Sequence, residues 1–255
     1  MARIYLIGGE KGGVGKSFVA RTLMQYFIDR GIPFAGVESD IGTPDVATIY
    51  KEYCKVARFS EDELKNDPFK IYDLALEKPV VVNLPANIIN PLKTWLVEKE
   101  MVQMGKDDGV FFCHWLVTNG KFDSIQPCLN VIEQLGGFIP HVLIKNHGTG
   151  REWDLMNEHP SLLKFTQQYF VPIIDFPDLD PKVVNKLLAE RLTYSQYQEP
   201  ERTASSMRVV VRSFLRKAYE AFESTGLLDI AQTPFLESNK SKGDDQQHKQ
   251  RKQRA

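Results

Sequence analysis

A glycine-rich segment with two lysines constrains this chain more than any other feature. Residues 10–17 read Glu-Lys-Gly-Gly-Val-Gly-Lys-Ser, after an apolar run over residues 3–8 and before a helix-like pattern over residues 17–30. A strand, a glycine loop and a helix in this order form a phosphate-binding loop, where backbone N–H groups and the helix N-terminus face anionic oxygens. The strict pattern has glycine where this chain has Glu10. We therefore expect a nucleotide-binding α/β domain.

Further strand-like runs alternate with helix-like segments along the chain. Strands are expected at residues 33–38, 79–84, 109–118, 137–146 and 170–175, and helices at residues 90–104, 124–135, 153–168 and 181–191. This alternation implies right-handed βαβ crossovers. The predicted fold class is a three-layer α/β P-loop NTPase, with a mostly parallel twisted sheet, helices on both faces and ligands at the carboxyl ends of the strands. Residues 41–78 give little pattern except a helix start at residues 60–63.

Length and composition favour one ordinary α/β domain with a tail. The expected division is residues 1–225 for the P-loop domain and residues 226–255 for a C-terminal extension. From residue 238 onwards six Lys or Arg face two Asp, a local charge of +4 against −1 for the whole chain, and no aliphatic or aromatic residue other than Ala255 follows. Such a segment is expected to be disordered. No apolar run reaches the ~20 residues of a membrane span, and Cys54, Cys113 and Cys128 have no disulfide or metal spacing, which favours the cytoplasm.

The residues of the loop have distinct expected roles. Glycines let the backbone approach the phosphates, a lysine neutralises charge and a serine hydroxyl binds Mg²⁺. The predicted nucleotide-binding residues are Gly12, Gly13, Val14, Gly15, Lys16, Ser17 and Phe18.

The segment Lys11 to Ser17 resembles the deviant Walker A motif of the ParA/MinD family of ATPases, in which the preceding residue varies. Residues 37–42, Val-Glu-Ser-Asp-Ile-Gly, are similar to the family's D-x-D switch segment, and residues 80–86, Val-Val-Val-Asn-Leu-Pro-Ala, to its Walker B strand. Asn146 ends an expected strand where the family's adenine-contacting Asn lies. The resemblance implies ATP and Mg²⁺ as cofactors.

The resemblance also implies a mechanism. ATP would join two chains face to face, with Lys11 reaching the partner's nucleotide while Lys16 and Ser17 act within the chain. Asp40 would position the attacking water. Glu38 and Asn83 would lie with Ser17 near the metal. The implied catalytic residues are thus Lys11, Lys16 and Asp40.

Asn83 departs from the Walker B pattern, which carries a carboxylate. An amide oxygen accepts a hydrogen bond from a metal-bound water but brings no negative charge. This substitution predicts weak Mg²⁺ binding or slow turnover, unless Glu38 compensates or the strand is aligned differently.

Other signals are weaker. Arg208, Arg212 and Arg216 recur every fourth residue beside an apolar helical stripe, so they form either a solvated helix face or, with the basic tail, a non-specific DNA surface. The spacing of His114, His141 and His147 does not indicate a metal site, and Trp95, Trp115 and Trp153 are expected to be packing residues. The C-terminus also lacks the membrane-binding helix of MinD-type proteins.

The main hypothesis is a slow ATPase that switches between monomer and ATP-bound homodimer to position or transfer cargo, such as plasmid DNA or a transfer or partition complex. Residues 111–118, 141–146 and 190–193 also resemble TraL-type proteins of the conjugal transfer branch. One alternative is a nucleotide-sensing adaptor with little or no hydrolysis. Another is a metabolic ATP-dependent ligase or synthase on the same scaffold.

Overall fold

A computed structural model describes residues 2–59 and 67–228 of the chain. The predicted helix start at residues 60–63 and the predicted disorder from residue 238 both lie outside this range. The strands are β1 (Ala2–Gly8), β2 (Ala35–Glu38), β3 (Cys54–Val56), β4 (Val80–Asn83), β5 (Val110–Thr118), β6 (His141–Asn146) and β7 (Ile173–Phe176). The helices are α1 (Lys16–Asp29), α2 (Asp45–Ile49), α3 (Asp67–Ala75), α4 (Ile89–Lys93), the π-helix η1 (Thr94–Glu98), α5 (Met101–Asp108), α6 (Phe122–Leu135), α7 (Asp154–Asn157), α8 (Pro160–Tyr169), α9 (Pro181–Ala189), α10 (Tyr194–Tyr197) and α11 (Ser205–Ser224).

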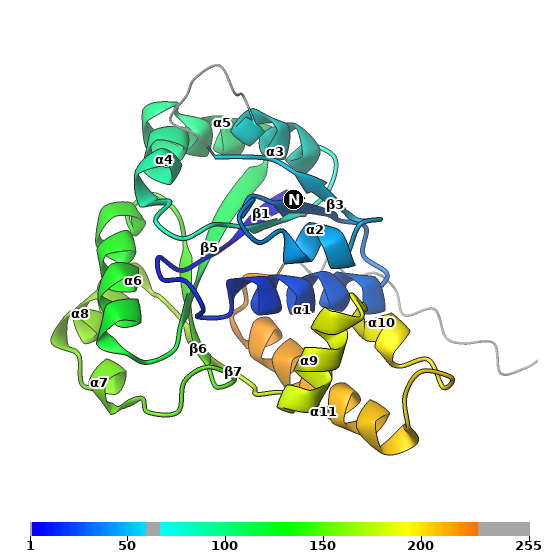
Figure 1. Cartoon of the computed structure of the whole chain (residues 1–255). Coiled ribbons are helices and arrows are strands. Elements are labelled where there is room, and N and C mark those ends of the chain that lie inside the picture. Colours follow the sequence, from blue (N-terminus) through cyan, green and yellow to red (C-terminus); the bar gives the residue numbers. More distant parts are fainter. Residues whose placement is uncertain (1, 60–66, 229–255) are drawn as a thin grey trace, which may run out of the picture.

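Within the described residues the strands form a seven-stranded sheet in the order β3-β2-β4-β1-β5-β6-β7. Every neighbouring pair is parallel, so the predicted mostly parallel sheet is confirmed. The carboxyl ends of the central strands meet at one edge, where β1 leads into the glycine loop and α1 (Figure 1). The register pairs Glu38 of β2 with Asn83 of β4, and Asn83 with Ile7 of β1.

Helices cover both faces of the sheet (Figure 1), as expected for three layers. One apolar core packs α1, α2, α9, α10 and α11 against the face that carries Tyr5, Val81 and Trp115. The other packs α3 to α8 and η1 against the face that carries Leu6 and Val82. Because both faces are covered, strands such as Val80–Asn83 are buried along their whole length.

Some predicted helices are divided in the structure. The expected helix at residues 90–104 is α4, η1 and α5, interrupted at Glu100, whose φ of 56° leaves the right-handed helical region. The expected helix at residues 153–168 is α7 and α8, because Pro160 begins a new helix at its first position. Periodicity misses both breaks, since the apolar spacing continues across them. The region at residues 41–78 contains α2, β3 and α3, which the sequence left unassigned.

The boundaries that position the loop agree with the prediction. Helix α1 begins at Lys16 and ends at Asp29, and Gly31 follows with a φ of 64°, the left-handed conformation typical after a helix end. Packing continues past the predicted domain boundary at residue 225, because Leu228 is buried in the same core as α11. In the part of the chain that the structure describes, no helix has the length and apolar character to cross a membrane.

Candidate phosphate-binding site

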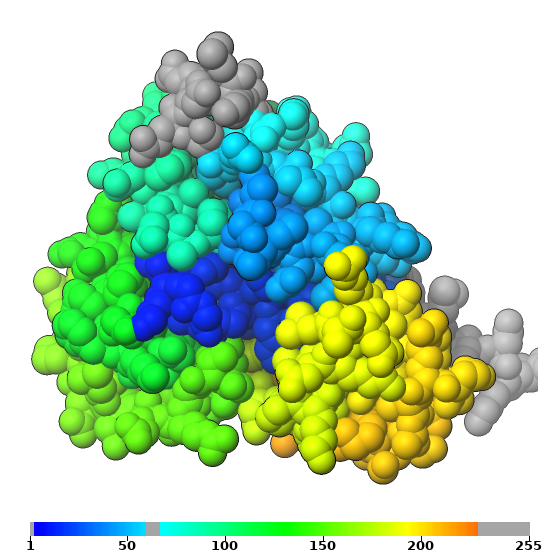
Figure 2. All heavy atoms as spheres, in the orientation of Figure 1, coloured from blue at the N-terminus to red at the C-terminus, as the bar shows by residue number. Residues whose placement is uncertain are grey.

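The glycine loop and the first turn of α1 border a cavity of about 390 Å³ at the carboxyl edge of the sheet. In Figure 2 the dark blue segment that includes the loop is exposed at the centre of this face, between the lighter blue segment and the yellow one. The first backbone N–H groups of a helix have no partner within it, so this edge favours an anion. The residues that line the cavity are Gly12, Gly13, Gly15, Lys16, Ser17, Phe18, Arg21, Asp40, Thr43, Asp45, Ala86, Asn146, Gly148, Thr149, Leu179, Val184 and Leu188.

Gly15 is held in place from the opposite side of the site. Its φ is 99°, and a Cβ at this position would lie 2.1 Å from Nδ2 of Asn146, so neither the backbone nor the space admits a side chain. Asn146 donates from Nδ2 to the carbonyl of Val14 at 2.8 Å, and Thr149 donates to the same carbonyl at 3.1 Å. The end of β6 therefore fixes the shape of the loop.

Both polar atoms of the Asn146 side-chain amide, Nδ2 and Oδ1, are hydrogen-bonded within the chain. Its Oδ1 accepts a hydrogen bond from the N–H of Gly148 at 3.0 Å, and its side chain is fully buried. The predicted nucleotide-binding residue thus lies at the cavity, where its hydrogen bonds shape the loop.

Lys16 is largely shielded from solvent at the edge of the cavity. Its side chain is buried, and Nζ donates to the carbonyl of Lys11 at 3.2 Å. Burial lowers the pKa of Lys16, while the charges of Asp40 and Glu10 act in the opposite direction. A cation held here with few hydrogen bonds is suited to neutralise a phosphate.

Glu10, the departure from the strict pattern, faces the start of α4. Burial raises the pKa of Glu10, and the backbone N–H groups of Ile89 and Ile88 and the charge of Lys16 oppose this shift. Lys11 lies on the outer side of the loop and forms an ion pair with Asp123 in the first turn of α6. Both contacts were absent from the sequence prediction, because neither partner has a signal that distinguishes it from other polar residues near a helix start.

A buried polar chain links β2, β4 and α1. Glu38 is fully buried and accepts hydrogen bonds from the N–H of Asp40 at 3.0 Å, the N–H of Val46 at 3.0 Å and Nδ2 of Asn83 at 2.8 Å. Asn83 also donates to Oγ of Ser17 at 3.2 Å. Burial raises the pKa of Glu38, and these donors oppose that shift without cancelling it. The carboxylate missing at position 83 therefore lies on the adjacent strand, at the paired position.

The arrangement around Ser17 fits a magnesium ion. Oδ1 of Asn83 is buried and has no hydrogen-bond partner among the described residues. Because Nδ2 faces the acceptor oxygens of Glu38 and Ser17, Oδ1 is the atom left for a metal or its water. Ser17 and Asp40 line the cavity beside it.

Most of the predicted site residues line the cavity, and four do not. Lys11, Val14, Glu38 and Asn83 do not line the cavity, whereas the other eight predicted residues do. Thr43 and Asp45 also line the cavity and were missed, although they follow Asp40 closely. Leu179, Val184 and Leu188 were missed because nothing in their local sequence indicates that β7 and α9 approach the loop.

The arginines singled out in the sequence lie on the surface of α11, the tryptophans lie in or against the apolar cores, and the cysteines are free thiols. Arg212 and Arg216 are exposed on α11, and Arg216 pairs with Glu220 at 3.0 Å, while Arg208 donates to Ser205 at 2.9 Å. Trp95 and Trp115 are buried in the cores, which confirms them as packing residues, and Trp153 packs against the second core. All three cysteines are free thiols. Among the described residues no three His, Cys, Asp or Glu side chains could together hold a metal ion.

Comparisons with known proteins support the fold. The chain is 26% identical to Protein MobD of Acidithiobacillus ferrooxidans over 198 residues, covering 75% of this chain and 85% of MobD. No family model matches the sequence.

Two solved structures share the architecture over nearly their whole length. The septum site-determining protein MinD of Pyrococcus horikoshii OT3, complexed with Mg-ADP, matches with a TM-score of 0.52 and 17% identity over 89% of this chain and 100% of MinD. A putative plasmid partition protein of Borrelia burgdorferi B31, bound to AMPPNP, matches with a TM-score of 0.52 and 12% identity over 88% of this chain and 99% of that protein. The resemblance predicted from the motifs is confirmed at the level of the fold: the chain has the P-loop fold of the ParA/MinD ATPases.

Proposed function

We propose that the chain binds ATP with Mg²⁺ in the cavity bordered by the glycine loop. The observation that supports this most directly is the convergence of a phosphate loop, the buried Lys16 and the unpartnered Oδ1 of Asn83 at one edge of the sheet. The loop and the N-terminus of α1 would hold the phosphates. Phe18, Leu179 and Val184 supply an apolar wall of the same cavity for the rest of the nucleotide.

We propose slow hydrolysis as the reaction. Phosphoryl transfer requires positioning and neutralisation of spread charge, which Lys16 supplies within the chain. Asp40 is half-buried on the cavity wall, with its N–H fixed by Glu38, and would orient the attacking water. Ser17 and Asn83 would hold the Mg²⁺ with Glu38 behind them, and the bound ion would neutralise charge on the phosphates. Since the carboxylate of Glu38 is used by three donors, the metal site is less negative than one with an aspartate at position 83.

We propose that ATP joins two chains through Lys11. In the single chain this lysine is paired with Asp123, and the two side chains are 34% and 58% exposed. Exposed ion pairs of this kind contribute roughly 0–1 kcal/mol, so releasing Lys11 costs little. A γ-phosphate on the partner would then attract Lys11 more strongly than Asp123 does, because it carries more charge.

The size of the protein in ATP, in ADP and without nucleotide tests this proposal. Light scattering after size exclusion should give a dimer only with ATP and Mg²⁺, and Lys11→Ala should remain a monomer while still binding ATP. Asp123→Asn is the matched variant, because it frees Lys11 without removing it and should leave or strengthen the dimer. A dimer that forms equally in ADP, or that survives Lys11→Ala, would contradict the proposed switch.

A nucleotide-sensing adaptor without useful hydrolysis is the second candidate. The neutral Asn83 beside Ser17 favours it, because Oγ of Ser17 accepts its hydrogen bond from the Asn83 amide, and this amide lies between Ser17 and the carboxylate of Glu38. Phosphate release measured alongside size separates the two candidates. An ATP-dependent dimer that keeps its ATP intact for hours supports the adaptor, whereas slow phosphate release supports the ATPase. Constant size with turnover that depends on a small carboxylate would indicate a metabolic ligase.

The proposed cellular role is to position or transfer cargo in the cytoplasm, where ATP is abundant and the three thiols stay reduced. The fold shared with a putative plasmid partition protein supports plasmid DNA or a transfer complex as cargo. Non-specific DNA contact through Arg208, Arg212, Arg216 and the basic tail would add ATP-dependent retention on duplex DNA at low salt that fades as salt rises. Retention that is indifferent to ATP and to salt would contradict this contact.

A further inference from the structure

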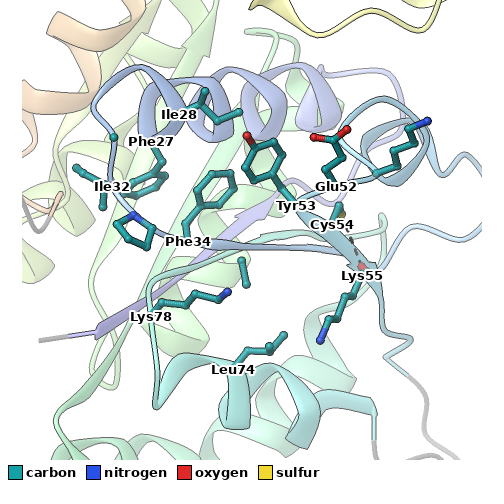
Figure 3. Close-up of a pocket in the computed structure, with 14 residues that line it drawn as sticks. Phe27, Ile28, Ile32, Phe34, Glu52, Tyr53, Cys54, Lys55, Leu74 and Lys78 are labelled. Carbon is teal, nitrogen blue, oxygen red and sulfur yellow. Dashed lines mark hydrogen bonds between the residues drawn. The ribbon is translucent and has the colours of Figure 1, made fainter.

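A second cavity, of about 560 Å³, lies at the opposite end of α1 from the glycine loop. It is formed by the end of α1, the starts of β2 and β3, and the end of α3 with the segment after it (Figure 3). None of its lining residues also lines the nucleotide cavity. Its volume falls within the roughly 300–1,000 Å³ of ordinary ligand sites.

One side of this cavity is aromatic and aliphatic. Phe34 stacks on Tyr53 with ring centroids 5.3 Å apart and an interplanar angle of 7°, and on Phe27 at 5.5 Å. Tyr53 is 41% exposed, so its ring extends this stack into solvent. Figure 3 shows Ile28 and Ile32 gathered around the same rings.

The other side of the cavity is basic. Lys55 and Lys78 lie across from the rings, beside Leu74 (Figure 3). With Lys51 the lining contains three lysines against one acid, Glu52, a net charge of +2. Within residues 2–59 and 67–228 none of these lysines has an ion pair, although the chain as a whole has a charge of −1.

The side chains that line this cavity favour ligand binding over catalysis. The thiol of Cys54 is not a nucleophile, because burial raises its pKa to about 12. No histidine lines the cavity, and Glu52 is exposed. Stacked rings with an exposed aromatic edge and a rim of lysines match a partner that brings an apolar anchor and negative charge.

We propose that this cavity, which we name the Tyr53 pocket, is a docking site for an acidic segment of a partner protein that carries an aromatic or large aliphatic side chain. The anchor packs on Tyr53 and Phe34, and the flanking Asp or Glu side chains face Lys55 and Lys78. The inference is independent of the proposed nucleotide switch, since the pocket is complete without the nucleotide cavity.

Fluorescence anisotropy with the full chain tests the inference. The probe is a fluorescein-labelled peptide of Asp and Glu residues around a central Trp-Leu pair. It should bind without nucleotide, and more weakly as salt rises because surface charges are screened. Lys55→Glu with Lys78→Glu should weaken binding at least about tenfold, and Tyr53→Ala about fivefold or more. Circular dichroism should show that these variants are folded, since all three residues are at least partly exposed.

Matched controls distinguish binding at the Tyr53 pocket from non-specific attraction between the acidic peptide and surface lysines. Lys182→Glu with Lys217→Glu makes the same change of charge on exposed positions of α9 and α11 and should leave binding unchanged. The acidic peptide with Gly-Ser in place of Trp-Leu should bind more weakly than the probe. The inference is overturned if the probe does not bind at millimolar concentration, or if both pairs of reversals weaken it equally. It is also overturned if the chain itself self-associates through Lys55 and Lys78, which would make the pocket a contact between copies.

Discussion

The two ends of helix α1 carry cavities of opposite construction. At its N-terminus, backbone groups, Lys16 and a buried polar chain surround the glycine loop. At its C-terminus, the exposed ring of Tyr53, stacked on the buried Phe34, and a set of lysines surround the Tyr53 pocket. The first cavity is held by buried groups that depend on one another. The second rests on the buried Phe27 and Phe34 but carries exposed side chains, such as Tyr53 and Lys55, that can be replaced without disturbing the core. We therefore expect changes at the loop to alter stability and binding together, and changes at the exposed side chains of the Tyr53 pocket to alter binding alone.

The largest effect is expected at Gly15. Gly15→Ala places a Cβ where Nδ2 of Asn146 lies and forces a φ of 99° on a residue that disfavours it. We expect a loss of about 2–4 kcal/mol in the free energy of unfolding and loss of detectable ATP binding. Urea unfolding and calorimetric titration measure the two quantities. Gly12→Ala is the control, because a Cβ there meets nothing within 4 Å and should leave stability unchanged.

A smaller effect is expected when the buried carboxylate is neutralised. Glu38→Gln places an amide N–H against the donors of Asp40, Val46 or Asn83, so the unfolding free energy should fall by about 1–3 kcal/mol and Mg²⁺-dependent ATP binding should weaken. Asn83→Asp alone should also destabilise, because two carboxylates would then lie in contact. Combining Glu38→Gln with Asn83→Asp should recover much of the loss. If the double variant is as unstable as the sum of the single ones, the two positions do not share one charge.

Lowering the pH should destabilise the fold through two buried histidines, one of which packs against the strand that leads into the loop. Burial lowers the pKa of His141 to about 4, and burial together with the charge of His141 lowers that of the adjacent His114, which packs against Gly8. Below pH 6.5 the unfolded chain takes up these protons before the folded chain does, so stability falls as pH falls from 6.5 towards 4. Each histidine contributes up to about 1.4 kcal/mol per pH unit in this window.

The variant His141→Leu isolates this effect. Its melting temperature should depend less on pH than that of the unchanged chain between pH 6.5 and 4, with little change at pH 7.5. The raised pKa of Glu38 acts in the opposite sense, because the folded carboxyl is protonated first, but it is common to both proteins. Identical pH profiles for the two proteins would show that His141 is not the group that titrates.

The smallest effect on stability is expected at the Tyr53 pocket. Tyr53→Ala removes one exposed stacking contact, so the unfolding free energy should change by less than about 1 kcal/mol and ATP binding should be unaffected. Urea unfolding and calorimetric titration with ATP check both expectations. A loss of ATP affinity would show that the two ends of α1 are coupled and would break the comparison.

The sequence determined the parts of this protein that depend on neighbouring residues. The loop at residues 10–17, the helix after it and the parallel strands follow from glycine spacing and apolar periodicity, which act over a few residues. The expected strands at residues 33–38 and 79–84 likewise place Glu38 at the end of β2 and Asn83 near the end of β4, and parallel strands end at one edge.

Only the tertiary structure decided which distant groups meet. That Asn146 fixes Gly15, that Glu38 is hydrogen-bonded to Asn83, and that Lys11 pairs with Asp123 all depend on strand order and on the approach of side chains far apart in the chain. The Tyr53 pocket likewise joins α1, β3 and the segment after α3, none of which has a local pattern that indicates the others. Local sequence specifies backbone conformation, whereas hydrogen bonds across the sheet and packing between layers depend on the whole fold.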